Sequence, residues 1–170
     1  MYRFGVLFLL TVLLVACGGN ADNITVNQEA PDFTLQDIDG NNYKLSDYEG
    51  ENPVVIYFYP KASTPGCTKQ ACGIRDDFAK FDEKGIKVFG VSVDDKEDLA
   101  EFREEYTLNF PLLSDADKKV AEEYGVLNNI GLASRITFII DKSGKIAEII
   151  RDVDVDTHSD DVYKIASKLL

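Results

Sequence analysis

VVIYFYPKASTPGCTKQAC, residues 54–72, is the stretch of the chain that decides its fold. The first six residues are β-branched or aromatic, and a run of this kind is too short for an ordinary helix and typical of a buried strand. Pro60 ends the run, and Thr64-Pro65 is a helix-start signal, with Thr64 as candidate cap and Pro65 preset for the first turn. The stretch therefore predicts a core strand, a turn and a helix, with Cys67 in the first turn of that helix.

The position of Cys67 favours a reactive thiol. The first turn of a helix offers unpaired backbone N–H groups and the positive end of the helix dipole, and both stabilise an anion. Free cysteine has a pKa of about 8.5, and helix N-termini can lower the pKa of a thiol to roughly 3.5–7.5. We therefore expect a nucleophile at the carboxyl end of a central strand.

The rest of the chain alternates strands and helices around this unit. A hairpin is expected over residues 31–46, followed by a short helical turn at 46–48. Apolar residues at spacings of three and four predict the buried face of a helix that runs to about residue 84. Further strands are expected at 86–93, 111–114, 135–140 and 146–153, and further helices at 95–106, 117–124 and 160–170. This order predicts an α/β protein with a thioredoxin-like fold, in which helices flank a central mixed β-sheet with an N-terminal β-hairpin.

Length and composition indicate one globular domain. The chain has 170 residues, 45% of them hydrophobic, including 10 Phe and 8 Tyr. This is enough to bury a sizeable core. The net charge of −12 argues against a nucleic-acid partner and against electrostatic docking to anionic membranes. The acidity is most simply interpreted as a contribution to solubility.

The N-terminus has the features of a targeting segment. Residues 1–16 carry one charge, on Arg3, and are otherwise mostly apolar, which suits a signal peptide better than a transmembrane helix. Leu14-Val15-Ala16-Cys17 resembles the lipobox of bacterial lipoproteins, which implies a lipidated Cys17 and a cell-envelope protein anchored on the extracytoplasmic side of a membrane. A cleaved secretory signal with an incidental Cys17, or an uncleaved anchor, are the alternatives. Residues 17–28 are then a flexible tether, and 29–170 the folded domain.

The stretch around Cys67 also carries a family resemblance. Pro60-Lys61-Ala62-Ser63-Thr64-Pro65-Gly66-Cys67 resembles the P-x-x-x-T-x-x-C signature of peroxiredoxins. Cys72, five residues further on, is similar to the second cysteine of the bacterioferritin comigratory protein, or peroxiredoxin Q, subgroup. The resemblance covers about residues 27–170.

The resemblance implies a role for each motif residue. Cys67 attacks the peroxide and becomes a sulfenic acid. Thr64 orients the peroxide, backbone N–H groups of Gly66 and Cys67 stabilise developing charge, and Pro60 shields the thiol. Arg135 holds the thiolate, because Arg135-Ile136-Thr137-Phe138 matches the family's pattern of an arginine before a Thr-Phe-aliphatic strand. From the residues alone, an exposed arginine in a weak surface pair is the favoured interpretation of Arg135.

Cys72 is implied to be the resolving cysteine, which joins Cys67 in a disulfide that a thioredoxin-like donor reduces. A permanent structural bridge is the alternative. In an intact helix the two Cα atoms are about 8–9 Å apart and the side chains diverge by about 140°. A disulfide needs Cα atoms within about 7 Å, so we expect the helix start to unwind on oxidation. The resemblance further implies hydrogen peroxide or organic hydroperoxides as substrate, no haem, flavin or metal, and a monomer.

Two rival functions follow from other features. A membrane-tethered thiol–disulfide oxidoreductase would use C-x-x-C, whereas the spacing from Cys67 to Cys72 is longer. A lipoprotein that only binds a partner through this fold is the non-enzymatic alternative.

Asp152–Asp156 superficially resembles a calcium loop but lacks the required Gly and Glu further on. His158, the single histidine, is interpreted as a surface or helix-start residue, and no metal site is expected.

Overall fold

A seven-stranded mixed β-sheet organises residues 24–170, the part of the chain that this computed structural model describes. The strands are β1 (Thr34–Asp37), β2 (Asn42–Lys44), β3 (Val54–Phe58), β4 (Lys87–Ser92), β5 (Leu112–Ser114), β6 (Ile136–Ile140) and β7 (Ile146–Ile150). The helices are η2 (Leu45–Tyr48), α1 (Pro65–Glu83), α2 (Lys96–Tyr106), α3 (Lys119–Glu123), α4 (His158–Ala166) and η3 (Ser167–Leu169). The strand order across the sheet is β2-β1-β5-β4-β3-β6-β7. The expected thioredoxin-like order of strands and helices is thus confirmed.

Strand β3 lies at the centre of this sheet. It pairs in parallel with β4 and antiparallel with β6, and all five of its residues are buried. Burial on both faces explains why its sequence is a continuous apolar run without polar alternation. Because side chains alternate along a strand, Val55 and Tyr57 face one side of the sheet while Val54, Ile56 and Phe58 face the other.

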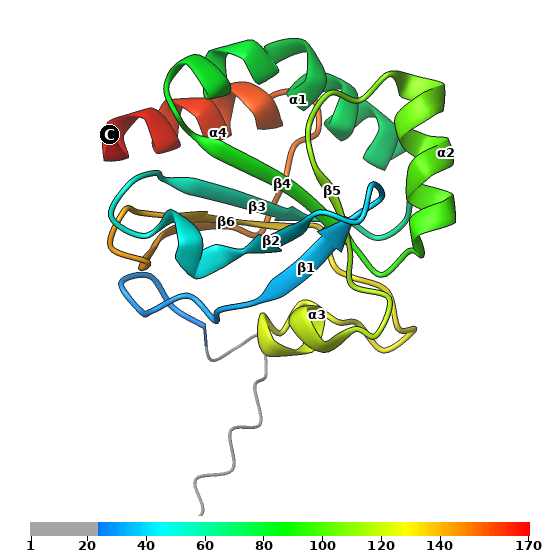
Figure 1. The fold of residues 1–170 in the computed structure, drawn as a ribbon, viewed down its shortest axis with the longest axis horizontal. Helices are drawn as coiled ribbons and strands as arrows, with labels where there is room; N and C mark the ends of the chain where they lie inside the picture. Colours follow the sequence, from blue (N-terminus) through cyan, green and yellow to red (C-terminus); the bar gives the residue numbers. More distant parts are fainter. Residues whose placement is uncertain (1–23) are drawn as a thin grey trace, which may run out of the picture.

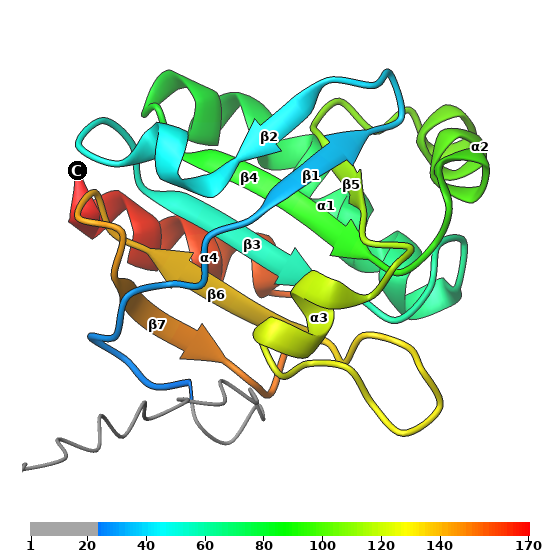
Figure 2. The same ribbon diagram turned by 60° about the horizontal axis from the view of Figure 1, so that its bottom comes forward.

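The two faces of the sheet are covered by different elements (Figures 1 and 2). Helices α1 and α4 pack on one face, and α3 and residues 24–33 pack on the other. We call the first the α1–α4 layer; its buried side chains include Val55, Tyr57, Tyr59, Cys67, Ala71, Ile74, Phe81, Leu99, Phe102, Ile139 and Val162. We call the second the α3 layer; its buried side chains include Phe33, Leu35, Ile56, Phe58, Phe89, Val120, Tyr124, Phe138 and Ile140.

The N-terminal end of the described chain is attached to the sheet. Asn27 N–H donates to the Ile146 carbonyl at 2.8 Å, Ile146 N–H donates to the Gln28 carbonyl at 2.9 Å, and Ile24 is buried. Residues 24–28, which the sequence assigns to a flexible tether, are therefore held against β7. The predicted signal segment 1–16 and Cys17 lie outside the described residues. Within residues 24–170, none of the helices combines the length and apolar character needed to cross a bilayer.

Candidate active site

Cys67 lies where the sequence predicts it, in the first turn of α1 just beyond the end of β3, and its side chain is 1% exposed. Thr64 occupies the cap position with extended backbone angles, and Pro65 begins the helix. The predicted side-chain cap is wrong, however, because the Thr64 hydroxyl donates to the Lys61 carbonyl at 2.9 Å instead of accepting from the helix. Pro60 follows β3 and is partly buried.

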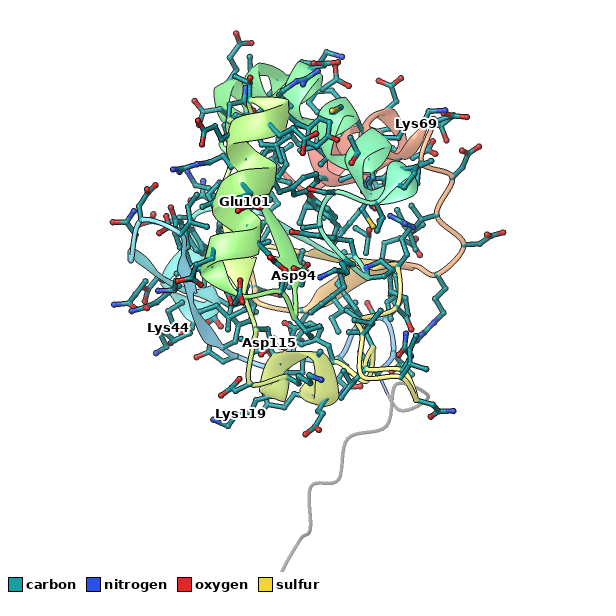
Figure 3. All side chains as sticks on the ribbon, turned by 90° about the vertical axis from the view of Figure 1, so that its right-hand side faces the viewer. Lys44, Lys69, Asp94, Glu101, Asp115 and Lys119 are labelled. Atoms are coloured by element: carbon teal, nitrogen blue, oxygen red, sulfur yellow. The ribbon has the colours of Figure 1, made fainter. Side chains whose placement is uncertain are left out.

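The turn between β3 and α1 is held by Asp94, which the sequence analysis missed. One carboxylate oxygen of Asp94 accepts from Ala62 N–H at 2.8 Å and from the Ser92 hydroxyl at 2.9 Å, and the other accepts from Lys61 Nζ at 3.1 Å. Ser63, in the same turn, has a φ of +56°, which is uncommon for a residue other than glycine. Figure 3, which views the end of the sheet where β4 finishes, shows Asp94 near the centre of that end. The carboxylate thus fixes a strained turn beside the thiol.

Arg135 reaches Cys67 from the start of β6. Its Nη2 atom donates to Cys67 Sγ at 3.3 Å, although the two residues are 68 positions apart. Gly66 permits this approach, since a Cβ atom there would lie only 3.2 Å from Nη2. The arrangement is therefore a sulfur with a fixed cation beside it, and not the exposed surface pair that was the alternative. A cation in this place favours the thiolate over the neutral thiol.

A line of buried polar side chains continues from Arg135 away from the sulfur. Arg135 Nη1 donates to Gln70 Oε1 at 2.5 Å, and Gln70 Nε2 lies 3.2 Å from Nδ1 and 3.4 Å from Nε2 of His158. His158 Nε2 in turn lies 2.8 Å from the Thr137 hydroxyl. Gln70, Thr137 and His158 are each at most 2% exposed. The interpretation of His158 as a surface residue is therefore wrong, although it does begin α4.

Part of this line could have been found in the sequence. Gln70 follows Cys67 by three positions, which places both on one face of α1. Thr137 follows Arg135 by two positions, which places both on one face of β6. No local pattern points to His158, because its burial depends on how α4 packs against α1 and β6.

Burial sets the protonation of the groups around the site. It lowers the pKa of His158 to about 4, and the nearby Arg135 charge acts in the same direction. It also raises the pKa values of Tyr57 and Tyr59 far above their usual range. At neutral pH these three rings are uncharged, and Arg135 is the charge in hydrogen-bonding contact with the sulfur.

Cys72 lies in the same helix as Cys67. Both cysteines are free thiols, Cys67 buried and Cys72 partly buried. Since α1 runs unbroken over residues 65–83, the two side chains diverge as the sequence predicts, and no disulfide joins them in this structure.

Comparison with known proteins gives consistent matches. Residues 26–149 match the AhpC/TSA family. Peroxiredoxin Bcp of Escherichia coli is 44% identical over 138 residues, which cover 77% of this chain and 88% of that protein.

Two solved structures are similar in fold as well as in sequence. Peroxidoxin BcpB of Mycobacterium tuberculosis aligns with a TM-score of 0.79 and 35% identity, over 87% of this chain and 99% of that one. The bacterioferritin comigratory protein of Xanthomonas campestris, described for its alkyl peroxide reduction activity, aligns with a TM-score of 0.73 and 31% identity, over 80% of this chain and 90% of that one.

Proposed function

The chain belongs to the AhpC/TSA family and is a peroxiredoxin of the bacterioferritin comigratory protein subgroup, a thiol-dependent peroxidase, and we propose that Cys67 is the residue that attacks the peroxide. The observation that supports this choice most strongly is the Arg135 guanidinium at 3.3 Å from Cys67 Sγ, at the start of a helix. The thiolate attacks one oxygen of the peroxide, the O–O bond breaks, and the leaving oxygen takes a proton. Cys67 becomes a sulfenic acid, and the peroxide becomes water or an alcohol.

The start of α1 provides donors for the leaving oxygen. The first helical bond in this region runs from Thr68 N–H to the Thr64 carbonyl, at 2.8 Å. The N–H groups of Gly66 and Cys67 precede it, where a helix leaves its donors without helical partners. Donors aimed at a developing charge are effective in catalysis because they need no reorganisation during the reaction. The Thr64 hydroxyl orients the peroxide, and Pro60 shields the thiol from water.

Cys72 resolves the sulfenic acid. Its thiol displaces the hydroxyl from Cys67, so that a disulfide forms and water leaves. The start of α1 must unwind for this step, and Gly66 and Gly73 favour unwinding, since glycine costs a helix about 1 kcal/mol relative to alanine. A dithiol of a thioredoxin-like donor then reduces the disulfide. The alkyl peroxide activity named for the Xanthomonas relative supports organic hydroperoxides as substrates beside hydrogen peroxide. We also propose that the enzyme is a monomer, as the resemblance to the subgroup implies.

The direct test is stopped-flow consumption of peroxide by the reduced protein. We expect rapid consumption of hydrogen peroxide and of an alkyl hydroperoxide, with one disulfide formed per turnover. An insulin-reduction assay addresses the rival thiol–disulfide oxidoreductase. Insulin reduction without peroxide consumption would support the rival, and inactivity in both assays with free thiols would support a binding protein.

We further propose that Cys17 carries a lipid anchor on the extracytoplasmic side of a bacterial membrane. The motif at residues 14–17 supports this proposal. Ile24 is buried in the domain and is only seven positions from Cys17. A fully extended chain of that length spans at most roughly 25 Å. The domain would therefore lie close to the membrane surface.

Replacement of Cys17 tests the anchor. Cys17→Ser is expected to move the protein from the membrane fraction to the soluble or unprocessed fraction, whereas Cys72→Ser, as a matched control, should leave its distribution unchanged. Membrane association that survives Cys17→Ser after signal cleavage would contradict lipidation.

A further inference from the structure

The amide of Gln70 has one permitted orientation. Arginine has five N–H donors and no acceptor, so only Oε1 of Gln70 can face Arg135 Nη1. The amide NH₂ group must therefore face His158. Gln70 is 1% exposed, and its side chain lies between the guanidinium and the imidazole.

The two distances from Gln70 Nε2 to the ring, 3.2 Å and 3.4 Å, describe how the amide meets His158. A donor in the ring plane and equidistant from both nitrogens would collide with the carbon between them. The amide therefore lies over the face of the imidazole. The face of a neutral aromatic ring is electron-rich and accepts N–H groups weakly, whereas a cationic ring repels them.

The surroundings of His158 keep its ring neutral and in place. Arg135 and Thr137 face it from β6, Gln70 from α1, and Tyr57 from β3 with ring centroids 5.8 Å apart. The remaining charge is Asp161, on its own helix. Burial and the Arg135 cation oppose protonation, and Asp161 only partly offsets them, which agrees with the lowered pKa of about 4.

We propose that His158 is a positioning residue for the thiol site: its neutral ring supports the Gln70 amide in the one orientation that presents Oε1 to Arg135, and so holds the guanidinium on Cys67. The inference rests on the proposed role of Cys67. Without the ring, Gln70 can rotate and Arg135 loses its second anchor. A displacement of a catalytic group by about 1 Å can cost on the order of 100-fold in rate.

The same arrangement links His158 to the redox state of the two cysteines. Gln70 lies between Cys67 and Cys72 in α1, so the unwinding that joins the cysteines removes the amide from the ring. In the disulfide form, His158 loses this cover and is expected to titrate closer to the ordinary histidine pKa of about 6.5.

A double-mutant cycle on the full chain separates this role from a general loosening of α4. Gln70→Leu and His158→Leu should each slow the reaction of Cys67 with hydrogen peroxide by about 10- to 100-fold, and the double variant should be no slower than Gln70→Leu alone. Val162→Ala, a buried change one turn further along α4 that removes none of these polar contacts, should leave the rate within about twofold and combine independently with Gln70→Leu. Independent effects of Gln70→Leu and His158→Leu would overturn the proposal.

The wild-type protein provides a second test that does not depend on the folding of a variant. His158 is the only histidine, so its ring protons give a single NMR titration. We expect a midpoint near 4 in the reduced protein and a clearly higher midpoint after diamide has formed the disulfide. A midpoint of about 6.5 in the reduced protein, or the same midpoint in both forms, would refute the proposal. Because this test needs no peroxide, failure of the proposed peroxidase activity would be recognised separately.

Discussion

The α1–α4 layer and the α3 layer pack on opposite faces of the same sheet, yet they are built differently. The α1–α4 layer buries Gln70, Thr137 and His158, and within residues 24–170 the hydroxyls of Tyr57 and Tyr59 have no hydrogen-bond partner. Each buried hydroxyl of this kind costs about 1–3 kcal/mol.

The α3 layer, by contrast, is rich in aromatic side chains, and the hydroxyl of its one fully buried tyrosine has a hydrogen-bond partner. Phe58, Tyr124 and Phe138 pack with ring centroids 5.0–5.9 Å apart, and Tyr124 Oη donates to the Pro31 carbonyl at 2.8 Å. The difference shows that the two faces of the sheet have different roles. One face holds polar side chains that position the thiol, and the other is mainly apolar packing that stabilises the domain.

The largest expected effect concerns the sulfur itself. Cys67→Ser should abolish peroxide reduction, because a serine hydroxyl cannot act as the redox-active nucleophile. Cys72→Ser, the matched control five positions along α1, should complete one turnover and then stall as a sulfenic acid, which a dimedone adduct detected by mass spectrometry would report. Equal single-turnover rates in Cys67→Ser and wild type would disprove the assignment.

A truncation in the α3 layer should affect stability and not chemistry. Phe138 is fully buried against Phe58 and Tyr124, so Phe138→Ala should lower the free energy of unfolding by about 3–5 kcal/mol. Denaturant unfolding measures this loss. The rate with peroxide, measured where the variant is still folded, should remain within about threefold of wild type, since the site lies on the other face. A large loss of rate in the folded variant would mean that the two layers are coupled.

Removal of the guanidinium should affect chemistry more than stability. Arg135→Ala should slow the reaction of Cys67 with peroxide by about 10²–10³-fold, as is typical when one charge-stabilising donor is lost. Arg135→Lys is the control that keeps the charge but cannot bond Gln70 and Cys67 at once with the two arms of a planar guanidinium. It should recover only part of the rate. Rapid-mixing kinetics and thermal unfolding of the same preparations would separate the two effects. An unchanged rate in Arg135→Ala would make this residue structural.

The smallest expected effect is on the pH dependence of the free energy of unfolding. A buried group in each layer contributes to it, and the two contributions have opposite sign. Burial lowers the pKa of His158 to about 4, so the stability that its neutral form contributes is present above about pH 6.5 and is lost as the pH falls toward 4. Burial raises the pKa of Asp115, the residue whose carboxylate accepts two backbone N–H groups of α3, to about 6. Its contribution is therefore present below its usual value of 3.8 and is lost as the pH rises through 6.

Conservative variants should reveal each trend by denaturant unfolding across this range. Relative to wild type, His158→Asn should gain stability as the pH falls from about 6.5 to 4, and Asp115→Asn should gain stability as the pH rises from about 4 to 6. Parallel pH curves for a variant and wild type would show that the group in question does not titrate differently on folding.

The sequence by itself determined the strand, turn and helix around Cys67, and the order of the elements that follow. These features are local: a run of β-branched residues, a proline, a cap position and apolar spacings each act over a few residues. The same locality places Gln70 on the face of Cys67, and Thr137 on the face of Arg135.

Only the tertiary structure decided which side chains meet. Pairing of Phe58 with Ile136 brings the start of β6, and with it Arg135, to the end of β3 beside Cys67. The packing of α4 buries His158 against Gln70, and the end of β4 brings Asp94 to the turn. The physical reason is that periodicity in a sequence encodes which face of an element is buried, whereas strand register and helix packing, set by contacts between distant residues, determine what that face touches.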